Sequence, residues 1–130
     1  MILVDTHVVV WLAFAQERIS PNARTAIHNA RNKEDGLAIC DITLWELTAI
    51  STKRRIQYSA SLESFLQEVE SRFVVLPINS RVCVRAMAFP ASYPRDPADR
   101  LIGATALVQG LALVTADSAI RRSRLIQTIW

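Results

Sequence analysis

Five carboxylates in this 130-residue sequence stand at positions where acidic side chains could do chemistry: Asp5, Glu46, Asp96, Asp99 and Asp117. Each one follows a short apolar run or lies near the start of an apolar helical pattern, so each is expected close to the end of a buried element. Carboxylate oxygens without a neighbouring His or Cys cluster favour Mg²⁺ or Mn²⁺ over Zn²⁺. The pattern therefore indicates a divalent-metal site.

Two of these acids fall on apolar helix faces. Glu46 has Ile42 at i−4 and Ile50 at i+4, so it stands on the apolar stripe of its helix. Asp99 has Ile102 at i+3 in a pattern with almost no polar face. An ionised carboxylate that is buried alone is very costly, and a divalent cation shared among several carboxylates lowers that cost.

Each acid also has a plainer interpretation. Asp5 could be a loop residue after a strand, and Glu46 could pair with a lysine or arginine. Asp99 could complement the dipole of its helix, Asp96 could be an N-cap, and Asp117 could cap the short helix after it. No single residue decides between the two interpretations, so the metal-site prediction depends on the conjunction of four acids at strand ends.

Short apolar runs alternate with helical patterns along the chain. Strands are predicted over 2–4, 37–40, 72–76 and 111–115, with a fifth, edge strand over 125–127. Helices are predicted over 6–14, 21–32, 42–53, 62–71, 80–89, 98–109 and 118–122. We expect Thr6 and Ser61 to be N-caps, Pro21 to lie in a first turn, and Gly110 to end its helix.

This alternation predicts an α/β fold, a three-layer α/β/α sandwich with a mostly parallel central sheet of four to five strands. We interpret residues 1–130 as one domain of ordinary size. In such sheets ligands bind beyond the carboxyl ends of the strands. The predicted topology can bring the five acids to that end, although they lie far apart in the sequence.

Composition and charge fit this interpretation. Hydrophobic residues make up 51% of the chain, and Cys40 and Cys83 stand among apolar neighbours, which favours two buried thiols. The apolar N-terminus contains Asp5 and lacks a basic region, and no apolar run reaches about 18 residues, so we expect neither a signal peptide nor a membrane span. We therefore expect a cytoplasmic protein.

Basic residues could guide a polyanion toward the acids. Five of the 12 acids are assigned to the site, which leaves seven against 15 Lys and Arg residues. Arg100 is the strongest phosphate-binding candidate, although it could instead pair with Asp96. The other basic candidates are Lys53, Arg54, Arg55, Arg95, Arg121, Arg122 and Arg124.

Three aromatic side chains near the acids are expected to be structural. His7 follows Asp5 by two residues, and Trp11 and Trp45 stand at helical core positions. For both tryptophans, packing in the core is favoured over stacking on a base. His28 is expected on an exposed helix face.

Four motifs around these residues resemble those of the PIN-domain family. Val4-Asp5-Thr6-His7, followed by Val10-Trp11-Leu12, is similar to the opening of that domain. Leu44-Trp45-Glu46-Leu47 resembles its acidic helix, and Leu113-Val114-Thr115-Ala116-Asp117 its T-x-D strand end. Asp96-Pro97-Ala98-Asp99-Arg100-Leu101-Ile102 resembles the D-P-x-D-R-L pattern of one bacterial branch. The resemblance spans nearly the whole chain in the right order.

The resemblance implies Mg²⁺- or Mn²⁺-dependent cleavage of phosphodiester bonds, usually in RNA. The implied catalytic and metal-binding set is Asp5, Glu46, Asp99 and Asp117, with Glu46 ligating directly or through water; Asp96, Thr115 and Arg100 are candidate supporting residues. One or two metal ions would activate water and neutralise the scissile phosphate. For chains of this size the resemblance also implies a VapC-type toxin, a small antitoxin partner, a homodimer, and an RNA substrate with tRNA among the candidates.

Two positions depart from the branch pattern. Pro94 stands where related sequences often have His, and Ala98 replaces a bulkier residue. These departures concern the shape of the loop and the fit of the substrate, not the acids.

Two other functions remain open. A non-catalytic module that binds RNA or protein could use the same fold, but it would gain nothing from clustered carboxylates near phosphate. A metal-dependent phosphatase would usually carry a D-x-D element, and Asp5-Thr6-His7 is not one.

Overall fold

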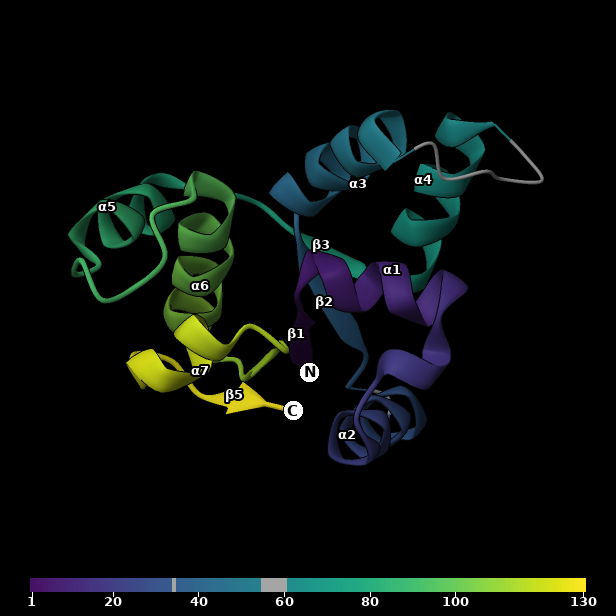
Figure 1. Cartoon of the computed structure of the whole chain (residues 1–130), viewed down its shortest axis with the longest axis horizontal. Coiled ribbons are helices and arrows are strands. Elements are labelled where there is room, and N and C mark those ends of the chain that lie inside the picture. The colour runs from purple at the N-terminus through teal and green to yellow at the C-terminus, as the bar shows by residue number, and fades with distance from the viewer. Residues whose placement is uncertain (34, 55–60) are drawn as a thin grey trace.

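The computed structural model describes residues 1–33, 35–54 and 61–130 (Figure 1). In this part of the chain a five-stranded sheet has the order β3-β2-β1-β4-β5, with every neighbouring pair parallel. Its strands are β1 Ile2–Val4, β2 Leu37–Cys40, β3 Val74–Leu76, β4 Leu113–Val114 and β5 Thr128–Ile129. The predicted parallel α/β class is confirmed.

Helices cover both faces of the sheet (Figure 1). They are α1 Thr6–Phe14, α2 Pro21–Asn32, α3 Ile42–Arg54, α4 Leu62–Arg72, α5 Ser80–Ala88, α6 Pro97–Gln109 and α7 Ser118–Ser123, with a 3₁₀ turn, η1, over Gln16–Arg18. As predicted, Ser61 caps α4, and Gly110 ends α6 at a φ of 67° in the left-handed region.

Side chains alternate between two cores along the strands, as extended backbone requires. Leu3 and Leu113 face a core that also contains Ile102 of α6. The next residues, Val4 and Val114, face the opposite core, which α1, α2 and α4 complete. Both faces of the sheet are therefore buried, which explains why its strands read as continuous apolar runs.

The first helix is capped differently from the prediction. Asp5, not Thr6, is the N-cap of α1, because its backbone is extended (φ −68°, ψ 151°) and its side chain accepts a hydrogen bond from the Thr6 N–H. Thr6 is already helical, so its hydroxyl is available for a more distant partner.

The last strand is displaced along the sequence. Arg124 adopts a left-handed φ of 55° after α7, and Ile126 is buried in the core beside α5 and α6. Strand β5 therefore begins only at Thr128, which aligns with Leu113. The predicted edge position is confirmed, but the predicted range of 125–127 is wrong.

Two predictions of burial are also wrong. Cys83 is exposed, whereas Cys40 is buried as expected. Trp45 is 68% exposed, because α3 directs Thr43 and Leu47 inward and Trp45 outward. Trp11 does pack as predicted, with its ring centroid 5.6 Å from that of Trp130.

No helix among the described residues is long and apolar enough to cross a membrane. The predicted basic position at Arg55 lies outside the described residues.

Candidate active site

The carboxyl ends of β1 and β4 lie side by side and form the centre of the site. Val4 aligns with Val114, and the Asp5 N–H donates to the Val114 carbonyl at 3.0 Å. This pairing brings Asp5 close to the segment that follows β4, which contains Thr115 and Asp117. The Asp5 side chain is buried, with 6% of the residue exposed.

Thr115 connects two of the predicted acids. Its hydroxyl donates to Asp5 Oδ2 at 2.7 Å and accepts a hydrogen bond from the Asp117 N–H at 3.1 Å. The other Asp5 oxygen, Oδ1, accepts from the Thr6 N–H at 2.8 Å. The orientation of the Asp5 carboxylate is therefore determined at both oxygens, and each oxygen retains lone-pair capacity.

Glu46 reaches the site from α3 through a pair of threonines. The Thr6 hydroxyl donates to Glu46 Oε1 at 2.6 Å and lies 3.0 Å from the Thr43 hydroxyl. Because Thr6 has one hydroxyl proton, Thr43 must be the donor in that second contact. Thr6 thus links the Asp5 end of β1 to Glu46.

Sequence patterns alone did not indicate Thr6 or Thr43 as site residues. The pattern around Thr6 predicts an N-cap only. The available signal for Thr43 was its place three residues before Glu46, one helical turn away and on the same face.

Asp96 and Asp117 both serve as N-caps. Asp96 Oδ1 accepts from the N–H groups of Ala98 at 2.8 Å and Asp99 at 3.4 Å. Asp117 Oδ1 accepts from the N–H groups of Ala119 and Ile120 at 2.9 and 3.0 Å. Within the described part of the chain, no hydrogen bond or ion pair engages Oδ2 of either residue. The capping interpretation is confirmed, and it leaves one oxygen of each residue for a ligand.

Burial and the charges of neighbouring acids raise the pKa of three of the five carboxyl groups. Partial burial, followed by the charges of Asp5, Asp96, Glu46 and Asp117, raises the pKa of Asp99 to about 7. Burial also raises the pKa of Asp5 and of Glu46 above their ordinary values, despite the hydrogen bonds that they accept. Asp99 therefore lies within electrostatic range of all four other carboxylates.

Among the side chains that the structure describes, no ion pair joins a Lys or Arg to any of the five acids; the ion pairs there join Met1 to Asp35 and Arg72 to Glu68. The pairing of Glu46 with a basic side chain, which the sequence left open, is thus not found there. The nearby cationic candidate is His7, which is exposed and acts against the rise in pKa of Asp5 and Glu46.

Arg100 has partners that the sequence did not indicate. It forms no ion pair with Asp96 in the described structure. Its side chain instead donates hydrogen bonds to main-chain carbonyls in the last turn of α5 and in the segment between α5 and α6. Arg95, Arg121, Arg122 and Arg124 are exposed, as contact with a polyanion would require.

The donor set suits Mg²⁺ or Mn²⁺ by its chemistry. Hard carboxylate oxygens without a paired cation are the protein ligands that these ions take. In the described residues, no group of three or more acidic, His or Cys side chains has the spacing of a ready-made metal site. A closed cage is not required, since Mg²⁺ usually retains several waters and needs few direct protein ligands.

The family of this fold and site is the PIN domain, whose family model matches residues 2–124; the chain belongs to that family. It is 38% identical to ribonuclease VapC22 of Mycobacterium tuberculosis over 123 residues. This alignment covers 95% of this chain and 92% of that relative.

Two solved structures share the fold. One is VapBC2 from Rickettsia felis bound to a DNA fragment from their promoter, with a TM-score of 0.75 and 18% identity over 98% of this chain and 97% of that one. The other is VapBC-1 from nontypeable Haemophilus influenzae, with a TM-score of 0.69 and 20% identity over 98% and 96%.

Proposed function

We propose that this protein is a Mg²⁺- or Mn²⁺-dependent endoribonuclease that acts as the toxin of a toxin–antitoxin pair. The observation that carries the proposal is the set of contacts that link the acids: Thr115 bonds both Asp5 and the Asp117 N–H, and Thr6 bonds Glu46. Burial, followed by the charges of the other acids, raises the pKa of Asp99 to about 7. Membership of the PIN family and the similarity to a protein named ribonuclease VapC22 support RNA as the substrate.

Each residue has a distinct part in the proposed reaction. Asp5, Asp99 and Asp117 hold the metal ion, and Glu46 ligates it directly or through water. Thr115 holds Asp5 in a single orientation through its 2.7 Å hydrogen bond. When bound, the ion supplies an activated water and neutralises charge on the scissile phosphate.

The hydroxyl of Thr6 orients Glu46 through a bond of 2.6 Å. Asp99 retains a proton up to about pH 7 while no cation is nearby, and it must release that proton before it can bind a metal ion. The proposed site therefore binds metal better as the pH rises through neutrality.

The proposed partners follow from the same assignment. They are an RNA substrate, with tRNA among the candidates, a cognate antitoxin, and a second copy of this chain in a homodimer. The toxin assignment is supported by the toxin–antitoxin complexes among the structural neighbours, which show the shared fold. We propose a cytoplasmic location and a single nuclease domain over residues 1–130.

The test is cleavage of a panel of tRNAs and structured RNAs by the purified protein in Mg²⁺, Mn²⁺ or EDTA. Asp5→Asn keeps the size of the side chain and can still hydrogen-bond Thr115, but it removes the charge and one of the two acceptor oxygens. We expect metal-dependent cleavage by the wild-type protein and at least a 100-fold lower rate in the variant, by analogy with the loss of a key electrostatic group in other enzymes.

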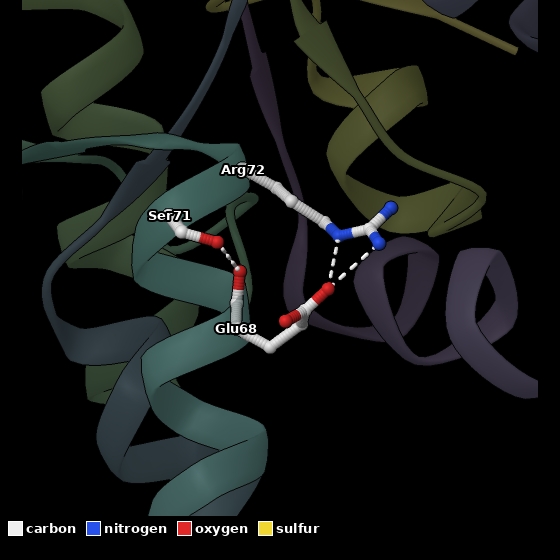
Figure 2. Close-up of polar contacts among 3 residues, drawn as sticks. All are labelled: Glu68, Ser71 and Arg72. Atoms are coloured by element: carbon white, nitrogen blue, oxygen red, sulfur yellow. Dashed lines mark hydrogen bonds and ion pairs between the residues drawn. The ribbon is translucent and has the colours of Figure 1, made fainter.

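Glu68→Gln is the matched control, because it makes the same change of carboxylate to amide on α4. Glu68 is exposed and bonds Arg72 within its own helix, with 2.7 Å to the guanidinium (Figure 2). Equal cleavage by wild-type and Asp5→Asn proteins would show that the site is misassigned or the preparation contaminated. RNA binding without cleavage in any metal would favour the non-catalytic module.

A further inference from the structure

Arg100 makes an unusually complete set of hydrogen bonds to the chain that precedes α6. Its side-chain nitrogens Nε, Nη1 and Nη2 donate to five main-chain carbonyls at 2.8–3.3 Å: those of Ala86, Phe89, Pro90, Tyr93 and Pro94. A guanidinium has five N–H donors in a fixed planar arrangement. All five are used here, so the segment from the end of α5 to Pro94 is held against the first turn of α6.

Arg72 shows what an ordinary surface arginine does in this protein. It is exposed and pairs with Glu68 one turn earlier on the same helix (Figure 2). Such a pair contributes little to stability. Arg100 instead joins two segments of the chain through neutral carbonyls, an arrangement that a lysine, with three donors from one atom, cannot reproduce.

Tyr93 makes a second link between the same two segments. Its hydroxyl donates to the Asp99 carbonyl at 3.0 Å, and its ring, 4.6 Å from that of Phe89, is almost fully buried. Gly103 leaves the space that this ring occupies, since a Cβ there would lie 2.9 Å from Tyr93 Cζ. The segment therefore contacts the main chain of Asp99 and the side chain of the next residue, Arg100.

These links act at the end of α6 that carries two of the acids. Asp96 and Asp99 stand at the start of α6, and both face the charge of Glu46. Like charges at this end push the first turn of α6 away from α3 and β1 unless the turn is held from behind. The carbonyl contacts of Arg100 oppose that displacement without adding a competing ion pair at the carboxylates.

We propose that Arg100 and Tyr93 are positioning residues that hold Asp99 and Asp96 at the distance from Asp5 and Glu46 that a shared metal ion requires. This inference rests on the proposed function, because it concerns the same metal site. It assigns the arginine of the D-P-x-D-R motif to the geometry of the acids and not to contact with phosphate. Residues that orient metal ligands typically change metal affinity or activity by about 10–100-fold when mutated.

The test compares Arg100→Met, Arg100→Lys and Tyr93→Phe with the wild-type protein, using Mn²⁺ as the probe. The dissociation constant for Mn²⁺ is measured without RNA by calorimetry, and the Mn²⁺ concentration that gives half-maximal cleavage is measured separately. We expect both the dissociation constant and this concentration to rise about 10–100-fold in Arg100→Met. A smaller rise of about fivefold is expected in Tyr93→Phe, which loses one neutral hydrogen bond and keeps the ring. Arg100→Lys should fall between Arg100→Met and the wild type.

Arg72→Met is the matched control, since it removes an arginine side chain outside the site, and its metal dependence should equal that of the wild type. A general loss of stability would lower the fraction of active protein without changing the Mn²⁺ concentration for half-maximal rate. If Arg100→Met does not fold, as judged by circular dichroism, Tyr93→Phe decides.

The inference would be overturned if the folded variants bound Mn²⁺ as tightly as the wild type and needed the same Mn²⁺ concentration for half-maximal cleavage. Absence of RNA cleavage by the wild-type protein would count against the proposed function instead, because the Mn²⁺ binding comparison would still measure positioning. A wild-type protein that bound no Mn²⁺ would overturn both.

Discussion

Replacement of Gly103 by alanine tests the packing behind the acids. Gly103 lies within α6, where alanine is favoured over glycine by roughly 1 kcal/mol from helix propensity alone. A Cβ at this position, however, would overlap the Tyr93 hydroxyl oxygen and lie 2.9 Å from Tyr93 Cζ and 3.1 Å from Phe89 Cε2. Helix propensity therefore predicts that Gly103→Ala stabilises the protein, whereas packing predicts that it destabilises it.

The packing contribution should be larger. Tyr93 is 1% exposed, its ring packs at a tilt of 53° against that of Phe89, and its hydroxyl is hydrogen-bonded to the Asp99 carbonyl, so it cannot swing into solvent without losing these contacts. Overpacking of a core costs about 1–3 kcal/mol, and loss of the hydrogen bond about 1 kcal/mol. After the gain in helix propensity, we expect a net destabilisation of about 2 kcal/mol. With an unfolding entropy of about 2.1 cal/mol/K per residue, that lowers the Tm by roughly 7 °C.

The assay is urea and thermal unfolding of wild type, Gly103→Ala, Tyr93→Phe and the double variant. Tyr93→Phe removes the oxygen that the new Cβ would overlap most closely. The cost of Gly103→Ala should therefore be smaller in the Tyr93→Phe protein than in the wild type. A Gly103→Ala protein at least as stable as the wild type would refute the reasoning.

Two further predictions concern the acids themselves. In metal-free protein the pKa of Asp99 is raised to about 7, so between about pH 4 and pH 7 the folded state holds a proton that the unfolded state has lost, and the contribution of Asp99 to stability falls as the pH rises through this window. Asp99→Asn should remove this loss. The free energy of unfolding of the variant, measured in urea with EDTA, should therefore increase relative to that of the wild type from pH 5 to pH 8. A difference in free energy that does not change with pH would contradict the raised pKa. Thr115→Val removes the hydroxyl that bonds both Asp5 and the Asp117 N–H, and should cost about 1–3 kcal/mol in stability and most of the cleavage activity. Thr115→Ser keeps the hydroxyl and should retain both, so equal activity in the two variants would show that this bridge is not needed.

Sequence patterns predicted part of the role of two of the acids. For Asp96 and Asp117 the sequence allowed either a cap or a site residue, and the structure shows that the choice was not exclusive. Oδ1 of each caps a helix, while Oδ2 has no bond within the described residues. A capping pattern is a local property of the chain, but the direction of the second oxygen depends on which strands are neighbours.

Side-chain partners outside the local segment were predicted less well. The pairing of Arg100 with Asp96 that the sequence left open is not found among the described residues, where the five bonds of Arg100 go to carbonyls six to fourteen residues earlier in the chain. Trp45 was expected in the core, yet it is exposed. Apolar character and helical spacing indicate a candidate core face, but they do not show which part of that face a neighbouring helix covers.

The sequence by itself determined the alternation of strands and helices and the placement of Asp5 directly after the first strand. Apolar periodicity and capping act over a few residues, so they can be read without knowledge of the rest of the chain. Only the tertiary structure decided that Thr6 connects Asp5 to Glu46 and that Thr115 connects Asp5 to Asp117. These contacts depend on the parallel pairing of β1 with β2 and β4. That pairing brings Thr6 to Glu46, which is 40 positions later in the chain, and Asp5 to Thr115, which is 110 positions later.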